Sequence, residues 1–232
     1  MNTKSLSSVF VKGKARQKMA GNYGTLIFTL IIQAVIIFAL TFGAADLFQS
    51  YLIYCIAVVL IDLLGGVVNA GRAYQYMNLI YDQSISVSDL FHGFKENADK
   101  AIIIRIPFAI TSFMAQIPYS LYLYGVIRSL PLVLMICTVS AILFILCSIY
   151  FGQSLFLLQD FPDKSAVELL KLSAAMMKGH ALKYFLLYLS FLPVFILGCI
   201  TLFIPLLWVE CYIEASRASF YRELIVTANT KE

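Results

Sequence analysis

The chain has 232 residues, of which 61% are hydrophobic and 13% are charged, and its formal net charge is +4. An average soluble domain has about 25% charged residues, so the composition excludes an ordinary soluble enzyme or binding domain. The positive charge does not indicate nucleic acid as a partner, because the basic residues lie in short segments between apolar runs, where they set the orientation of membrane helices.

Four long runs of the chain contain no charged side chain. They cover residues 19–45, 106–127, 129–159 and 184–209. About 20 apolar residues cross the hydrocarbon core of a bilayer, at about 1.5 Å per residue. The sequence therefore predicts an all-α, polytopic membrane helix bundle, with residues 1–232 forming a single membrane domain.

About six membrane-spanning helices are predicted, after a basic amphipathic segment over residues 1–22 and together with amphipathic helices on the inner surface. The spans lie near residues 24–43, 47–69, 101–124, 132–155, 184–203 and 205–222. The last apolar block, residues 184–221, would be about 57 Å long as one helix, which exceeds a hydrocarbon core of about 30 Å. Pro205 is therefore the expected break. Because the sixth span contains charged residues, five spans with an external C-terminus are the alternative.

The basic residues predict the orientation of the protein. If both termini are cytoplasmic, 16 of the 17 lysine and arginine residues lie on the inner side, and Arg128 alone lies outside. An excess of these residues marks the cytoplasmic loops of membrane proteins. The predicted localisation is thus the cell membrane, with several crossings and both termini in the cytoplasm.

Residues 165–178 are predicted to form an amphipathic helix at the inner membrane face. Ser165 and Glu168 form a capping box at its start, and Gly179 is expected to end it. Its basic stripe, which is expected to contact anionic lipids, consists of Lys164, Lys171 and Lys178. Its apolar stripe consists of Val167, Leu170, Ala174 and Met177. The N-terminal segment has a similar apolar stripe, which consists of Leu6, Val9, Phe10 and Met19.

A short pattern occurs three times along the chain. A glycine closes a basic amphipathic segment at Met19–Asn22, at His92–Phe94 and at Met177–His180, and a predicted hairpin of two spans follows each. The protein is then either a threefold repeat of helix plus hairpin, or a bundle whose inner-surface helices end at glycine for local reasons.

Five charged residues fall inside the predicted spans: Asp62, Arg105, Glu210, Glu214 and Arg217. A charge in the middle of a span costs about 2.5–3.5 kcal/mol, so such residues usually pair or line water. A rise of about 1.5 Å per residue puts Asp62, Arg105 and Arg217 in one layer of the inner half of the bilayer. We predict that Asp62 pairs with Arg105 or Arg217 and that Glu214 supports Arg217. This intramembrane charge cluster forms either a substrate or proton pathway or a structural ion pair.

Motifs for catalysis and for metal or cofactor binding are missing from the sequence. There is no P-loop, no G-x-S-x-G, no H-E-x-x-H and no Cys/His cluster. The sequence therefore predicts that the protein is not an enzyme and has no catalytic, cofactor-binding or metal site. Gly65 and Gly66 in the second span are expected to allow close helix packing.

Several strings of this sequence resemble one bacterial membrane family, catalogued as domain of unknown function 975. In the C-terminal half they are SAAMMKGH at Ser173–His180, FLLYLSF at Phe185–Phe191 and YIEASRASFY at Tyr212–Tyr221. In the N-terminal half they are KMAGNYG at Lys18–Gly24 and DLFHGF at Asp89–Phe94. The resemblance covers nearly the whole chain and departs at Cys211, where the family commonly has proline. It implies a bacterial, largely Gram-positive, integral membrane protein, and it brings no established activity and no catalytic residues.

Two functions fit these features. The first is a non-enzymatic integral membrane protein of the bacterial cell envelope, in the handling of lipids or membrane peptides or as a subunit of a membrane-protein complex or homo-oligomer. The basic inner-surface segments, which suit anionic lipid head groups, favour it. The alternative is a small secondary transporter or channel that uses the buried charges.

Overall fold

The structure is a computed structural model that describes residues 6–48, 50–123, 125–201 and 205–229. The described part of the chain forms helices joined by short segments and contains no strand, which confirms the predicted all-α class. The predicted ends of two spans, at residues 124 and 203, lie outside the described residues.

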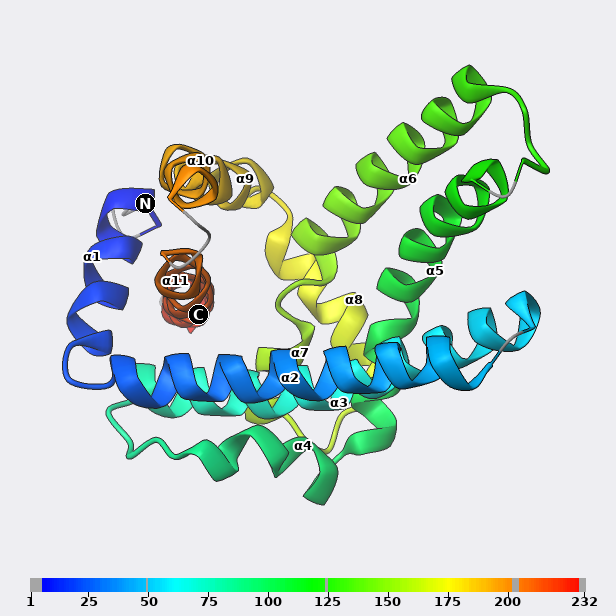
Figure 1. The fold of residues 1–232 in the computed structure, drawn as a ribbon. Coiled ribbons are helices and arrows are strands. Elements are labelled where there is room, and N and C mark those ends of the chain that lie inside the picture. The colour runs from blue at the N-terminus through cyan, green and yellow to red at the C-terminus, as the bar shows by residue number, and fades with distance from the viewer. Residues whose placement is uncertain (1–5, 49, 124, 202–204, 230–232) are drawn as a thin grey trace.

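Three helical hairpins make up most of the fold (Figure 1). The first consists of α2 (Tyr23–Leu47) and α3 (Tyr51–Ile80). The second consists of α5 (Ala98–Leu123) and α6 (Leu130–Phe151). The third consists of α9 (Ala181–Leu189), α10 (Leu192–Ile200) and α11 (Leu206–Asn229). In Figure 1 the α5–α6 hairpin rises at a steep angle from the α2–α3 hairpin, while α10 and α11 are seen nearly end-on.

A short helical segment comes before each hairpin. These segments are α1 (Ser8–Met19), then η1 (Val87–Phe91) with α4 (His92–Lys95), and then α8 (Ala166–Met177), which follows α7 (Ser154–Asp160). The order of short helix and hairpin therefore occurs three times, as the repeat hypothesis predicts.

The first and third short helices enter their hairpins through the same tight turn. Gly21 and Gly179 have φ values of 85° and 81°, and the residue before each has a ψ near 120°, as in a type II turn. A hydrogen bond from Asn22 N to Met19 O, at 2.9 Å, closes the first turn. The second junction between a short helix and its hairpin was predicted at His92–Phe94. In the structure it lies after the end of α4, where Asn97, with a φ of 58°, precedes α5.

Five helical segments are long and apolar enough to cross a membrane, close to the predicted number of about six. They are Tyr23–Leu47, Tyr51–Ile80, Ala98–Tyr122, Leu130–Asp160 and Ala181–Ile200. Their outward side chains are apolar and exposed, as on α2, where Val35, Phe38 and Phe42 are more than half exposed. These are the features of a multi-pass membrane protein.

Helix α11 corresponds to the predicted sixth span and lies inside the bundle instead of at its surface. It packs against α1, α2, α3 and α10. Cys211, Ala215, Ala218 and Tyr221 on α11 are completely buried. Because it contains several charged residues, α11 is not among the five apolar segments above. Much of its surface is nevertheless buried against other helices. The loop before it contains Pro205, the predicted break.

Helix α1 lies along α11 and ties the N-terminal segment to the third hairpin. Lys12 Nζ donates to the carbonyl oxygen of Ser190 at 2.9 Å and lies 3.8 Å from the centre of the Phe191 ring. Lys14 forms an ion pair with Glu223 near the end of α11. Helix α1 and the end of α11 therefore lie side by side.

The buried faces of α1 and α8 match only in part the apolar stripes that were predicted for these two helices. Of the predicted N-terminal stripe, Leu6 before α1 and Met19 at its end are buried, but Val9 and Phe10 are 81% and 42% exposed. Within α1 the buried positions are Val11, Ala15 and Met19. In α8, Ala166, Leu169, Ser173 and Met177 are buried, whereas Val167 is 53% exposed. An amphipathic helix of this kind can lie at the lipid surface or against the bundle; here α1 packs on α11, and α8 packs on α5, α6 and α7.

The predicted capping box of α8 is present. Glu168 N donates to Ser165 Oγ, and Ser165 N donates to the Glu168 carboxylate at 2.9 Å. The bond from the Ser165 backbone holds the pKa of Glu168 below its ordinary value. The helix ends at Met177, two residues before Gly179, as predicted.

Three predicted spans differ in their helix boundaries. Helix α3 does not end at residue 69 but continues to Ile80. The fourth span breaks at Gly152 and Gln153, between α6 and α7, and the fifth breaks at Ser190 and Phe191, between α9 and α10. The last break follows from Pro193 in the first turn of α10, because proline suits the start of a helix and not its interior.

Candidate functional site

A cavity of about 680 Å³ lies between the three hairpins. Its walls come from α3, α5, α6, α7, α9, α10 and α11 and are mostly apolar, with Phe108, Phe144, Phe156 and Phe185 among them. Ligand cavities in proteins commonly have volumes of about 300–1,000 Å³. The cavity is thus large enough for a small ligand or for part of a lipid.

The face of α3 that borders the cavity has small and polar residues at helical spacing. Gly66, Asn69 and Ala73 line it, and Asp62 lies one turn earlier on the same face. A Cβ added at Gly66 would lie 2.7 Å from the Cβ of Arg105, so the glycine lets α5 approach α3 closely. Of the two adjacent glycines expected to allow close packing, Gly66 makes this contact, whereas Gly65 has only the end of Ile37 at 3.8 Å.

Asp62 and Arg105 form an ion pair between α3 and α5. The Arg105 Nη2 donates to Asp62 Oδ1 at 2.7 Å, and both side chains are 25% exposed. This is one of the two pairings predicted from depth along the spans. Arg105 Nε and Asp62 Oδ2 are buried and have no hydrogen-bond partner among the described residues.

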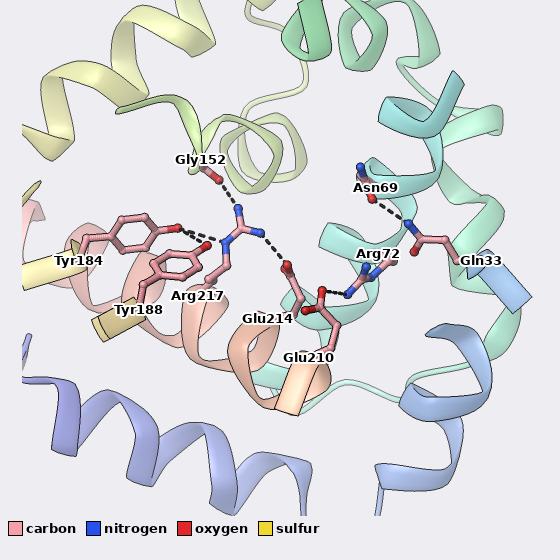
Figure 2. Close-up of polar contacts among 9 residues, drawn as sticks. All are labelled: Gln33, Asn69, Arg72, Gly152, Tyr184, Tyr188, Glu210, Glu214 and Arg217. Atoms are coloured by element: carbon pink, nitrogen blue, oxygen red, sulfur yellow. Dashed lines mark hydrogen bonds and ion pairs between the residues drawn. The ribbon is translucent and has the colours of Figure 1, made fainter. Parts of the chain in front are cut away.

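Arg217 is held by three hydrogen bonds, one from each nitrogen (Figure 2). Its Nη1 donates to Glu214 at 2.7 Å, its Nη2 to the carbonyl oxygen of Gly152 at 2.9 Å, and its Nε to the hydroxyl of Tyr184 at 3.1 Å. The predicted support of Arg217 by Glu214 is therefore present. Asp62 pairs with Arg105 and not with Arg217, each of whose three nitrogens already has a partner on another residue.

Arg72 is the cavity residue that the sequence prediction missed. Its Nη2 lies 3.4 Å from a carboxylate oxygen of Glu210, and its side chain is 11% exposed (Figure 2). The predicted second span ended at residue 69, which left Arg72 outside the membrane helices. The sequence does indicate that the helix continues past Arg72, because apolar residues recur at helical spacing on both sides of it. These are Val68, Ala73 and Tyr76, and all three are buried.

A pair of amides joins α2 to the cavity face of α3. Gln33 Nε2 donates to Asn69 Oδ1 at 2.9 Å (Figure 2). The Oε1 atom of Gln33 is buried without a hydrogen-bond partner in the part of the chain that the structure describes. Polar groups in a membrane interior are usually paired or functional, so these amides belong to the polar side of the site.

The predicted charge cluster is therefore two separate ion pairs, with a third pair added by Arg72 and Glu210. Arg105, Glu214 and Arg217 line the cavity, and Asp62 reaches it through Arg105. Three arginines face three carboxylates, so the ionised set is electrically balanced. This arrangement can hold charges in apolar surroundings and can exchange one partner for a charged ligand.

The other predicted site residues do not take part in the cavity. The lysines predicted to contact lipid, Lys164, Lys171 and Lys178, are all exposed at or near α8 and do not line it. Among the described residues, no group of three or more His, Cys, Asp or Glu side chains is placed to hold a metal ion.

Comparison with known proteins gives the family of the chain. No curated protein and no solved structure matches it. Residues 4–228 match a family described as "Protein of unknown function (DUF975)". Since the match covers nearly the whole sequence, the resemblance seen in its strings is confirmed, and the chain belongs to this family.

Proposed function

We propose that the protein is a non-enzymatic integral membrane protein of the bacterial cell envelope that binds an amphiphilic molecule, such as a lipid or a membrane peptide, between its hairpins. The observation that carries this proposal is the cavity, which combines apolar walls with three ion pairs, of which Glu214–Arg217 is the most buried. An apolar chain fits the walls, and a polar head fits the charged side.

The position of the exposed lining residues supports entry from the membrane. Phe144 and Ile145 on α6, and Phe185 and Leu189 on α9, line the cavity and are more than a third exposed. In a bilayer these side chains face hydrocarbon. A lipid can then enter sideways between α6 and α9 without crossing water.

The proposed location is the cell membrane with both termini in the cytoplasm. The charge asymmetry of the sequence supports it, because 16 of 17 basic residues then lie on the inner side. The contact between α1 and the end of α11 is consistent with termini that share one side.

Filling the cavity tests the proposal. Ser148 lies on α6 and lines the cavity, so Ser148→Phe should reduce binding of a tail-labelled phospholipid by the protein in nanodiscs. Leu146→Phe is the matched control, because Leu146 is on the same helix, is 44% exposed and does not line the cavity. Equal binding by wild type and Ser148→Phe would contradict the proposal.

A second candidate is a small secondary transporter or channel. The observation that favours it is that all three hairpins contribute charged residues to one cavity: Arg72, Arg105, and Glu210 with Glu214 and Arg217. Substrate-dependent flux into proteoliposomes, abolished by Arg72→Gln, would support transport. Binding of an amphiphile without any flux would favour the first proposal.

A further inference from the structure

The three arginines of the cavity differ in how many of their donors are used. A guanidinium has five N–H donors. Arg217 donates from all three of its nitrogens, whereas among the described residues Arg72 and Arg105 each donate from Nη2 alone. The Nε of Arg105 is buried, so a ligand reaches only the terminal nitrogens of this side chain. Arg217 is therefore fixed by the fold, while Arg72 and Arg105 bring unused donors to the cavity.

Glu210 differs from the other two carboxylates in the same way. Asp62 and Glu214 lie 2.7 Å from their arginines, and their side chains are 25% and 16% exposed. Glu210 lies 3.4 Å from Arg72, and its side chain is 44% exposed. It can release Arg72 without becoming a buried unpaired charge, which the other two carboxylates cannot do.

The surroundings of Arg105 are aromatic. Its guanidinium carbon lies 5.8 Å from the centre of the Phe108 ring. Phe144 packs edge-on against Phe108, with ring centres 6.2 Å apart, and both rings line the cavity. Two arginines that line the same cavity as these rings can hold an anionic group at one end and an apolar chain beside it.

We infer that the cavity binds a lipid-like molecule whose head carries phosphate or carboxylate oxygens, through Arg72 and Arg105. The head takes the place of Glu210 at Arg72 and bonds to the free donors of Arg105, and the chain lies against the phenylalanines of α5 and α6. This inference rests on the proposed function and adds to it the charge of the ligand and the residues that recognise it.

The test uses the full-length protein in phosphatidylcholine nanodiscs and two probes with the same fluorescent acyl chain. One is a lysophosphatidate, which is anionic, and the other is the corresponding monoacylglycerol, which is neutral. The wild type should bind the lysophosphatidate at least tenfold more tightly than the monoacylglycerol, since a charge-assisted hydrogen bond is worth about a factor of ten or more. Glycerol phosphate and inorganic phosphate are then added as competitors without a chain.

Two variants should move the lysophosphatidate affinity in opposite directions. Arg72→Gln should weaken it about tenfold, while Glu210→Gln should strengthen it, because a competing carboxylate is removed. Both should change monoacylglycerol binding much less than lysophosphatidate binding, because the neutral head makes no charged contact. Arg128→Gln is the charge-matched control, because Arg128 is exposed outside the cavity. A folding defect cannot imitate this result, since it would weaken both probes.

The outcomes separate this inference from the proposed function. Equal affinity for the two probes, or Glu210→Gln weakening the anionic probe as Arg72→Gln does, would overturn the inference while leaving amphiphile binding intact. Binding of neither probe would overturn the proposed function as well. If inorganic phosphate displaced the lysophosphatidate at the probe's own concentration, the site would take free anions, and the claim of a lipid-like ligand would be overturned.

Discussion

Gly66 of α3 lies directly against Arg105 of α5, and this contact brings the Asp62–Arg105 pair together. A Cβ at Gly66 would be 2.7 Å from the Cβ of Arg105 and 3.1 Å from the backbone oxygen of Ala101. Asp62 lies one helical turn before Gly66, so the place where the helices touch is also where their charges meet. The close packing at Gly66 and the Asp62–Arg105 ion pair thus depend on the same contact between α3 and α5.

Alanine substitutions at the adjacent glycines should therefore have different effects. Gly66→Ala requires α3 and α5 to move apart, because the new methyl group meets backbone as well as side chain, and overpacking of this kind typically costs about 1–3 kcal/mol. Gly65→Ala meets only the end of Ile37 at 3.8 Å and should be neutral or slightly stabilising, since alanine favours helix over glycine. Thermal unfolding in detergent measures both. Similar stabilities for the two variants would contradict the close contact.

The Asp62–Arg105 pair can be tested with a double-mutant cycle. Asp62→Asn leaves Arg105 partly buried without its anion, and breaking a buried pair from one side costs about 3–5 kcal/mol. Adding Arg105→Gln should restore part of the loss, because no unpaired charge remains. Denaturant titration of the four proteins gives the coupling energy. Asp46→Asn is the control, because Asp46 is exposed at the end of α2. A double variant no more stable than Asp62→Asn would show that the two charges do not depend on each other.

Arg217 should be needed for stability, whereas Arg72 should matter mainly for ligand binding. Arg217→Gln removes the partner of Glu214, whose side chain is 16% exposed, and is expected to destabilise the protein by about 3–5 kcal/mol. Arg217→Lys should not rescue it, because one ammonium cannot reach Glu214, Tyr184 and Gly152 together. Arg72→Gln should lower stability much less, since Glu210 is more exposed. Equal losses for Arg72→Gln and Arg217→Gln in the same unfolding assay would refute this difference.

The sequence predicted those parts of the fold and site that depend on local pattern. Uncharged runs located the hairpins, the capping box located α8, and counting residues along the spans brought Asp62 level with Arg105. Each of these depends on spacing along one segment. The choice between Arg105 and Arg217 as the partner of Asp62 could not be made this way, because it depends on Tyr184 and Gly152, which come from other elements.

The rest of the site could not be predicted because it depends on which helix covers which. In the sequence alone, Arg72 resembles the start of a loop. In the fold, α11 provides its ion-pair partner Glu210, and the part of α3 around Arg72 is buried. The buried face of α8 differs from the predicted stripe because it is set by the positions of α5, α6 and α7, which lie against it. Hydropathy along one chain carries no information on such neighbours.

The exposed lysines near α8 should attract anionic lipid. Replacing Lys164, Lys171 and Lys178 with glutamine should weaken the association of phosphatidylglycerol with the protein, by about 1 kcal/mol for each base near the surface. Spin-labelled lipid in mixed nanodiscs measures the change, which should shrink at high salt. Lys171→Gln can be compared with Arg128→Gln, a surface charge at the far end of the α5–α6 hairpin. Equal effects of these two single changes would show that the α8 lysines are merely solvated.

The most informative test of the architecture is whether α11 crosses the membrane. The Arg222 guanidinium donates to the carbonyl oxygen of Ile80 at 2.8 Å, and Lys14 pairs with Glu223, so the end of α11 lies beside the end of α3 and beside α1. Two crossings separate α1 from the end of α3, which puts both on one side. The end of α11 can join them only if α11 crosses as well. Its two most central charges do not prevent this, because Glu214 and Arg217 are paired with each other and largely buried in the protein.

Single cysteines on a cysteine-free background test this crossing. Ser129→Cys lies between α5 and α6 and should react with a membrane-impermeant reagent added to intact cells. Glu96→Cys, which comes before α5, and Val226→Cys, near the end of α11, are also exposed in the fold and should react only after permeabilisation. Glu96 is the control for the inner side, because it does not depend on α11. If Val226→Cys reacted from outside while Glu96→Cys stayed protected, α11 would not cross, and the contacts of Arg222 and Lys14 could not form in the membrane.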